Sequence, residues 1–191
     1  MKRTMTSEEI ESRTARFGEL QSMQVPLDRE TVSQDAMDVI FARKILPVIM
    51  EKTKNPFGDV GAIYGANGLT MNISVLPPAQ GPCLHAHNST HETFIVLEGD
   101  ITFHIGEPGE EKHLTLGRWD TFSCPPEVYR GFNNASDTRG AVLLTIINGD
   151  PSARDDVNVP ASVTTHLRDT FGEPVLNEFR KVVKLPEAET E

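Results

Sequence analysis

The chain has 191 residues, which suits one domain with additional terminal segments. Its 18 basic and 28 acidic residues give a formal net charge of −10, a field that repels DNA and RNA, so we expect no nucleic-acid partner. No apolar run approaches the roughly 20 residues needed to cross a bilayer, and no apolar segment follows the basic N-terminus, so we expect a cytoplasmic protein without a membrane partner.

The first elements are short and lie in a polar N-terminal segment. Residues 7–20 favour a short helix with Ser7 as its N-terminal cap and Gly18 as its stop. Residues 35–50 are apolar but interrupted by Pro47. They indicate a helical turn followed by a strand, although the pattern alone does not separate the two.

The middle of the chain has a different texture, with short apolar or alternating runs separated by Gly, Pro, Asn and Asp. The runs are VGAIYGA, LTMNISVLP, HETFIVLEG, ITFHIGE, HLTLG, DTFSCPP and AVLLTIING. Many short strands at regular spacing predict a β-sandwich or a small barrel. The runs do not alternate with helical patterns, which argues against a doubly wound α/β fold.

The C-terminal part returns to helical and charged sequence. Residues 160–171 predict a short helix that ends at Gly172, and residues 173–191 are charged and expected to be loosely held. We therefore divide the chain into an N-terminal extension with helix or edge strands (residues 1–58), a β-barrel (residues 59–150) and a C-terminal helical segment with a tail (residues 151–191).

Two histidines and a glutamate stand out in the stretch HAHNSTHETFIVLEG. His85 and His87 are two apart, so a strand points them to the same side, and the turn-prone triplet after them lets Glu92 face them from the next strand. Two imidazoles and one carboxylate on a rigid sheet form a facial ligand set for a divalent metal. The plain alternative is a pair of half-buried strand histidines with no ligand role.

The same stretch resembles the first motif of the cupin superfamily. In that motif two histidines separated by one residue are followed by a glutamate and, six residues later, by a glycine, as in His85, His87, Glu92 and Gly99. The upstream glycine of the motif corresponds to Gly81, closer than usual. The segment LGRWDTFSCPPEVYRGFNN resembles the second motif of the superfamily in spacing, through Asp120, Pro125, Pro126, Val128, Phe132 and Asn134.

The second motif departs from the family pattern at three positions. Trp119 and Glu127 stand where the family usually has glycine, and Arg130 stands where the fourth metal ligand, a histidine, is expected. Arginine stays protonated and has no lone pair for a metal. In one reading the metal keeps three ligands and Arg130 forks a substrate carboxylate. In a second the metal is lost and Arg130 pairs with Glu92, and in a third Arg130 points outward and Tyr129 points in.

The resemblance implies an all-β cupin-type jelly-roll β-barrel with an N-terminal extension and short C-terminal helices. It implies metal ligation by His85, His87 and Glu92, with Arg130 and Glu92 as catalytic groups. We expect His91 to face the opposite side of its strand from Glu92. The residues expected to line the substrate pocket are Arg130, Tyr129, Cys83, Phe94 and His104.

The resemblance also implies a function. Cupins similar to this sequence include quercetinase-like dioxygenases that act on small enolisable molecules, which implies Fe(II), with Mn, Ni, Co or Zn as alternatives. A redox-neutral lyase, isomerase or epimerase and a non-catalytic ligand-binding module remain open. We expect a homodimer formed through the N-terminal extension, and we expect Cys83 and Cys124 to be free thiols.

Overall fold

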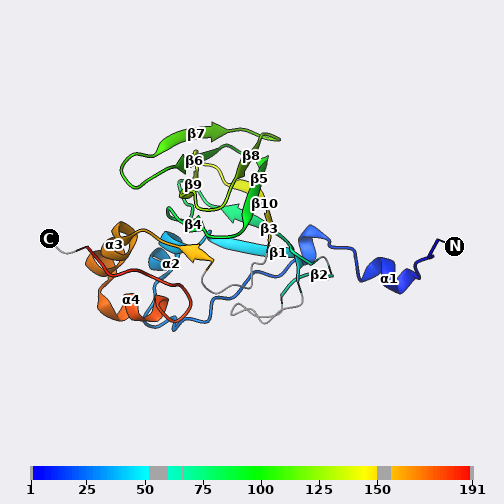
Figure 1. The fold of residues 1–191 in the computed structure, drawn as a ribbon. Helices are drawn as coiled ribbons and strands as arrows, with labels where there is room; N and C mark the ends of the chain where they lie inside the picture. Colours follow the sequence, from blue (N-terminus) through cyan, green and yellow to red (C-terminus); the bar gives the residue numbers. More distant parts are fainter. Residues whose placement is uncertain (1, 52–59, 66, 150–155, 190–191) are drawn as a thin grey trace.

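The computed structural model describes residues 2–51, 60–65, 67–149 and 156–189 (Figure 1). In these ranges the helices are α1 (Ser7–Glu11), the 3-10 turn η1 (Phe17–Glu19), α2 (Gln34–Ile40), α3 (Ala161–Phe171) and α4 (Glu173–Phe179). The strands are β1 (Lys44–Met50), β2 (Ile63–Tyr64), β3 (Leu69–Leu76), β4 (Ala86–His87), β5 (His91–Glu98), β6 (Ile101–Ile105), β7 (Lys112–Leu116), β8 (Thr121–Cys124), β9 (Arg130–Asn134), β10 (Ala141–Asn148) and β11 (Val157–Asn158).

The strands form three sheets, with orders β2-β1-β3-β10-β5-β8, β7-β6-β9 and β11-β4. The two larger sheets share one core, whose centre is an aromatic cluster of Phe94, Phe103, Phe122 and Phe132 with neighbouring ring centroids 5.2–6.2 Å apart. The prediction of a mostly β domain with a few short helices is confirmed.

A closed barrel, in contrast, is not formed by the described strands. Between the sheets, residues 80–85 run beside β9 and bond to its backbone only near their two ends, at Gln80, where Asn134 N lies 3.0 Å from Gln80 O, and at His85. Pro82 in this stretch has no N–H to extend the ladder. The sheets therefore face each other without continuous hydrogen bonding around the core.

The contact between residues 80–85 and β9 requires two glycines. A Cβ on Gly81 would lie 1.8 Å from the carbonyl oxygen of Phe132, and one on Gly131 would lie 3.0 Å from the backbone of Cys83. The close approach allows paired backbone bonds between His85 and Arg130, at 2.9 and 2.8 Å. It therefore places a predicted metal ligand directly beside the arginine of the second motif.

The helices α2, α3 and α4 gather at one end of the sheets (Figure 1) and enclose a second apolar core. The helix predicted over residues 160–171 is confirmed as α3, which ends at Gly172. The expectation that residues 173–191 are loosely held is wrong for α4. Val175, Leu176 and Phe179 lie on one face of this helix and are buried in the second core, while its charged residues lie outside.

The N-terminal elements also differ in detail from the prediction. The cap of α1 is Thr6 rather than Ser7, because Thr6 and Glu9 form a reciprocal capping box, and the helix ends at Glu11, well before Gly18. The helix and strand predicted over residues 35–50 are confirmed as α2 and β1, and β1 pairs with β3 inside the six-stranded sheet. The domain boundaries expected near residues 58 and 150 lie outside the described residues. The helices in the described ranges all lack the length and apolar character of a membrane span.

The two departures from glycine in the second motif lie at left-handed backbone positions, with φ of 74° at Trp119 and 62° at Glu127. A non-glycine residue there costs about 1–2 kcal/mol, and glycine gives back about 0.5–1 kcal/mol in chain entropy. We therefore expect Glu127→Gly to raise the free energy of unfolding, measured by urea denaturation, by about 0.5–1 kcal/mol. Glu127→Ala removes the same side chain but keeps the strain, so a gain of equal size in that control would contradict the explanation.

Candidate metal centre

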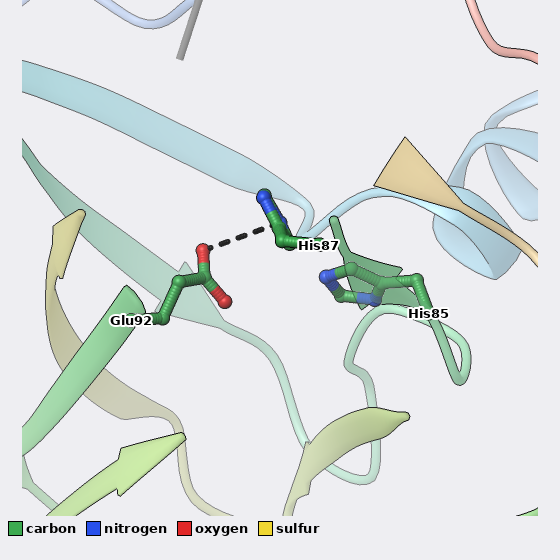
Figure 2. A group of neighbouring side chains, drawn as sticks. All are labelled: His85, His87 and Glu92. Carbon is green, nitrogen blue, oxygen red and sulfur yellow. Dashed lines mark ion pairs between the residues drawn. The ribbon is translucent and has the colours of Figure 1, made fainter. Parts of the chain in front are cut away.

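The three predicted ligands come from neighbouring elements. His87 lies in β4, His85 is the residue just before that strand, and Glu92 lies near the start of β5. Figure 2 shows the three side chains converging on one space, and one ligand atom from each lies within 4.8 Å of the others. His87 and Glu92 are 9% and 5% exposed. The strand alternation that predicted this grouping therefore holds in the structure.

The outer nitrogen of each imidazole is held by the protein. His85 Nδ1 lies 2.8 Å from the carbonyl oxygen of Cys83, and His87 Nδ1 lies 2.7 Å from Oδ2 of Asp156. Because both partners accept hydrogen bonds, each Nδ1 carries a proton, and the neutral form of each ring has its lone pair on Nε2. His87 Nε2 lies 3.6 Å from Glu92 Oε1 (dashed in Figure 2). The free lone pairs therefore point toward the carboxylate.

Asp156 was missed by sequence reasoning, and it organises the turn after His87. Its Oδ1 accepts from the backbone N–H and the hydroxyl of Ser89, at 2.8 and 2.6 Å. Its Oδ2 accepts from Thr90 Oγ1 at 2.7 Å as well as from His87. The pairing of β11 with β4 brings this carboxylate to the site. These hydrogen bonds lower the pKa of Asp156 to about 2 despite the opposing effect of burial.

Arg130 points into the molecule and is only 1% exposed. Its Nε and Nη2 both donate to Oε2 of Glu92, at 3.0 and 2.5 Å, and its Nη1 donates to the carbonyl oxygen of His85 at 3.3 Å. The outward reading of Arg130 is therefore wrong. The guanidinium donates only to Oε2 of Glu92, so Oε1 still faces the imidazoles.

The electrostatics of the site set its protonation state. Desolvation, followed by the nearby Arg130 cation, lowers the pKa of His85 to about 4. Burial by itself would raise the pKa of Glu92, but the Arg130 cation and the two imidazoles outweigh it, and the pKa lies below its ordinary value. At neutral pH the site thus combines a neutral His85 imidazole with an ionised carboxylate, which are the states that bind metals.

These observations fit a divalent metal. The donors are two imidazole Nε2 atoms and one carboxylate oxygen, a mixed N/O set that several first-row ions accept. The Asp156 carboxylate behind His87 is the kind of partner that orients metal-binding histidines. The paired Arg130 does not block the set, because its hydrogen bonds to Glu92 use only Oε2.

The remaining predicted site residues have varied places. Phe94 is buried in the aromatic cluster, on the same face of β5 as Glu92, and Tyr129 is half-buried beside Arg130. Cys83 packs against the second core, and burial raises the pKa of its thiol to about 12. His91 is exposed, as its parity predicted. His104 lies on the opposite face of β6 from the buried Phe103, so its predicted place in the pocket is wrong.

Residues 72–147 match the family model described as Cupin domain. The match runs from β3 into β10 and includes His85, His87, Glu92 and Arg130. It supports the cupin superfamily that the two sequence motifs indicate, and it covers less than half of the chain. No curated protein matches the chain.

Solved structures with similar strand arrangements include proteins of different kinds. The Cnp3 cupin domain of Schizosaccharomyces pombe aligns at 12% identity and a TM-score of 0.43, over 56% of this chain and 64% of that chain. Hydroxypropylphosphonic acid epoxidase from S. wedmorenis aligns at 20% identity and a TM-score of 0.39, over 42% and 43%. A predicted oxalate decarboxylase from Thermotoga maritima aligns at 21% identity and a TM-score of 0.39, over 44% and 69%. The chain spans less than two thirds of the first two, and likeness at this level says nothing about its activity.

Proposed function

We propose that the chain is a metal-dependent dioxygenase that acts on a small organic substrate, with the ion held by His85, His87 and Glu92. One observation carries the proposal. Both imidazoles have Nδ1 engaged by protein acceptors, so both Nε2 atoms are free to converge with the Glu92 carboxylate, within 4.8 Å. Histidines without a ligand role would have no need for Nδ1 to be held by a protein acceptor in both rings.

The donor set supports the choice of reaction class. Two histidines and one carboxylate with further coordination positions open are the ligand set typical of non-haem Fe(II) oxygenases. Fe(II) is therefore the ion we expect, while Mn, Ni, Co and Zn accept the same donors. A metal bound there supplies Lewis acidity and, for Fe(II), electrons for dioxygen.

The residues around the ligands have positioning roles in this proposal. Arg130 holds Oε2 of Glu92 and keeps the carboxylate ionised, so that Oε1 is presented to the ion. Asp156 fixes His87 through Nδ1. With neutral imidazoles, the side chains of Glu92, Arg130 and Asp156 sum to one negative charge. A divalent ion reverses that sign, which favours an anionic or enolisable substrate with adjacent oxygens.

The first experiment measures bound metal and oxygen uptake together. We expect purified protein loaded with Fe(II) under argon to retain about one ion per chain, by elemental analysis, and His85→Ala to lose it. His91→Ala is the matched control, because that imidazole is exposed next to Glu92 and should leave the metal content unchanged. A wild type that never retains a stoichiometric ion overturns the proposal. Metal retention with turnover of catechol or diketone compounds but no oxygen uptake indicates a redox-neutral enzyme instead.

A second candidate function follows from the contact between Arg130 and Glu92. The guanidinium already neutralises the buried carboxylate, as a metal would. This geometry favours a metal-free module that binds a small anion beside the imidazoles. Such a module would be stabilised against heat by its ligand in the presence of a chelator and would show no turnover.

A further inference from the structure

A second pair of histidines lies outside the candidate metal centre. His104 of β6 and His113 of β7 are direct cross-strand neighbours. Their Nδ1 atoms are 2.9 Å apart, and their rings meet edge to face, with centroids 4.9 Å apart. His104 lies on the opposite face of β6 from Phe103, which is buried in the core. The pair is therefore on the outer face of the three-stranded sheet, while Arg130, next to the Gly131 that pairs with His104, points to the inner face.

The orientation of His104 is fixed from behind. Its Nε2 lies 2.6 Å from Oδ1 of Asn133, whose Nδ2 donates to the carbonyl oxygen of Asn134 at 2.9 Å. The second contact settles which end of the Asn133 amide is the oxygen. Nε2 of His104 must then carry a proton, and in the neutral ring Nδ1 accepts a hydrogen bond from Nδ1 of His113, whose proton a metal ion would replace. A histidine held this way by a carbonyl oxygen is the usual arrangement for a metal ligand.

The spacing of the two nitrogens suits a shared ion. Two metal–imidazole bonds of about 2.0–2.1 Å that meet near a right angle place their nitrogens about 3 Å apart. The Glu111 carboxylate, two residues before His113, interacts electrostatically with both imidazoles and adds negative charge nearby. The outer face of β7 is exposed, so water can complete the coordination shell.

We propose that His104 and His113 form a second, surface metal site that binds one divalent transition-metal ion through their Nδ1 atoms. Because the protein donors are imidazoles, the site prefers Cu²⁺, Ni²⁺ or Zn²⁺ and does not select Mg²⁺ or Ca²⁺. The proposal is independent of the function proposed for His85, His87 and Glu92.

The test counts ions with Cu²⁺ as the probe. After chelator treatment, wild type, His104→Ala and His113→Ala are titrated by equilibrium dialysis, and we expect each variant to bind one ion fewer than wild type. Thr115→Ala is the matched control, because Thr115 faces Thr102 on the same strands through a hydroxyl contact of 2.9 Å, and it should bind as wild type does. We expect Asn133→Ala to weaken this ion by about tenfold, since the tautomer of His104 is no longer fixed.

Two further measurements make the result decisive. Circular dichroism and thermal unfolding of the metal-free proteins should be alike for wild type and His113→Ala, because His113 is exposed. Electron paramagnetic resonance should show two imidazole-coupled Cu²⁺ signals in wild type and only one in His113→Ala, because His85 and His87 still supply imidazole nitrogen to the remaining ion. Equal numbers of ions and equal affinities in wild type and both histidine variants would overturn the proposal.

Discussion

Replacement of Arg130 by Met should lower the free energy of unfolding of the metal-free protein by about 3–5 kcal/mol, measured by urea denaturation. Arg130 is 1% exposed and Glu92 is 5% exposed, and two hydrogen bonds join the guanidinium to one carboxylate oxygen. Methionine fills similar space but leaves the Glu92 carboxylate buried without its main partner. The cost is therefore that of an uncompensated buried charge, which exceeds the value of the pair itself.

A matched control and a second variant isolate this cause. Arg16 pairs with Glu11 on the surface, where both side chains are at least half exposed, so Arg16→Met should leave the free energy of unfolding close to that of wild type. Removing both charges in Glu92→Gln/Arg130→Met should restore much of the lost stability. A double variant as unstable as Arg130→Met would show that packing of the arginine, rather than its charge, matters here.

The same variant separates the two proposed functions. If the site holds a divalent ion on Glu92, the ion supplies the positive charge that the variant lacks, and added Fe(II) or Zn²⁺ should reduce the loss of stability. In a metal-free anion-binding module, added metal would leave the loss unchanged. The contact between Arg130 and Glu92 is thus informative in either case.

Local alternation was enough to predict the ligand set. His85 and His87 share one side of their strand, Glu92 faces them from the next, and the exposed His91 lies on the other side of β5. The direction of Arg130 could not be decided in the same way, because the prolines before it break the parity of the strand. Its inward direction follows from β9, where Arg130 shares a face with the core residue Phe132, and from its backbone bonds to His85.

The features that the sequence could not predict depend on long-range contacts. Asp156 lies 69 residues from His87, in front of a strand of two residues that has no periodicity to detect. In α4 only three apolar positions are buried, and the surrounding charges hide them in a composition-based reading. His104 alternates correctly with Phe103, but the sequence does not say which of the two faces is the core.

Replacement of Asp156 by Asn should weaken metal binding about 10- to 100-fold, measured by competition with a chelator. Asparagine is close to isosteric with aspartate, so the variant changes which groups donate protons and leaves the shape of the site nearly unchanged. Oδ1 of Asp156 accepts from the backbone N–H of Ser89, which can only donate, so the amide oxygen of the variant must stay at that position. The new NH₂ group then faces Nδ1 of His87, and that nitrogen can accept from it only by losing its own proton.

The tautomer of His87 is therefore expected to invert, with the proton on Nε2, where the ion needs a lone pair. Asp169→Asn is the matched control, because the exposed Asp169 pairs with the half-buried Arg168 of α3 rather than with a predicted metal ligand. Nuclear magnetic resonance of the imidazole nitrogens reports the tautomer directly, in metal-free protein. An unchanged tautomer with unchanged affinity would remove Asp156 from the positioning role.

The pH dependence of the free energy of unfolding provides a second test of the role of Asp156. The pKa of Asp156 is lowered from 3.8 to about 2, so its contribution to folding is present above about pH 4 and is lost as the pH falls toward 2. Asp156→Asn has no proton to gain in this range, so the difference in unfolding free energy between wild type and variant should shrink from pH 4 to pH 2. A difference that stays constant over this range would mean that Asp156 acts only through the shape of the turn. A difference that shrinks, together with an inverted tautomer, would mean that one charge both holds the turn and keeps the lone pair of His87 directed at the metal.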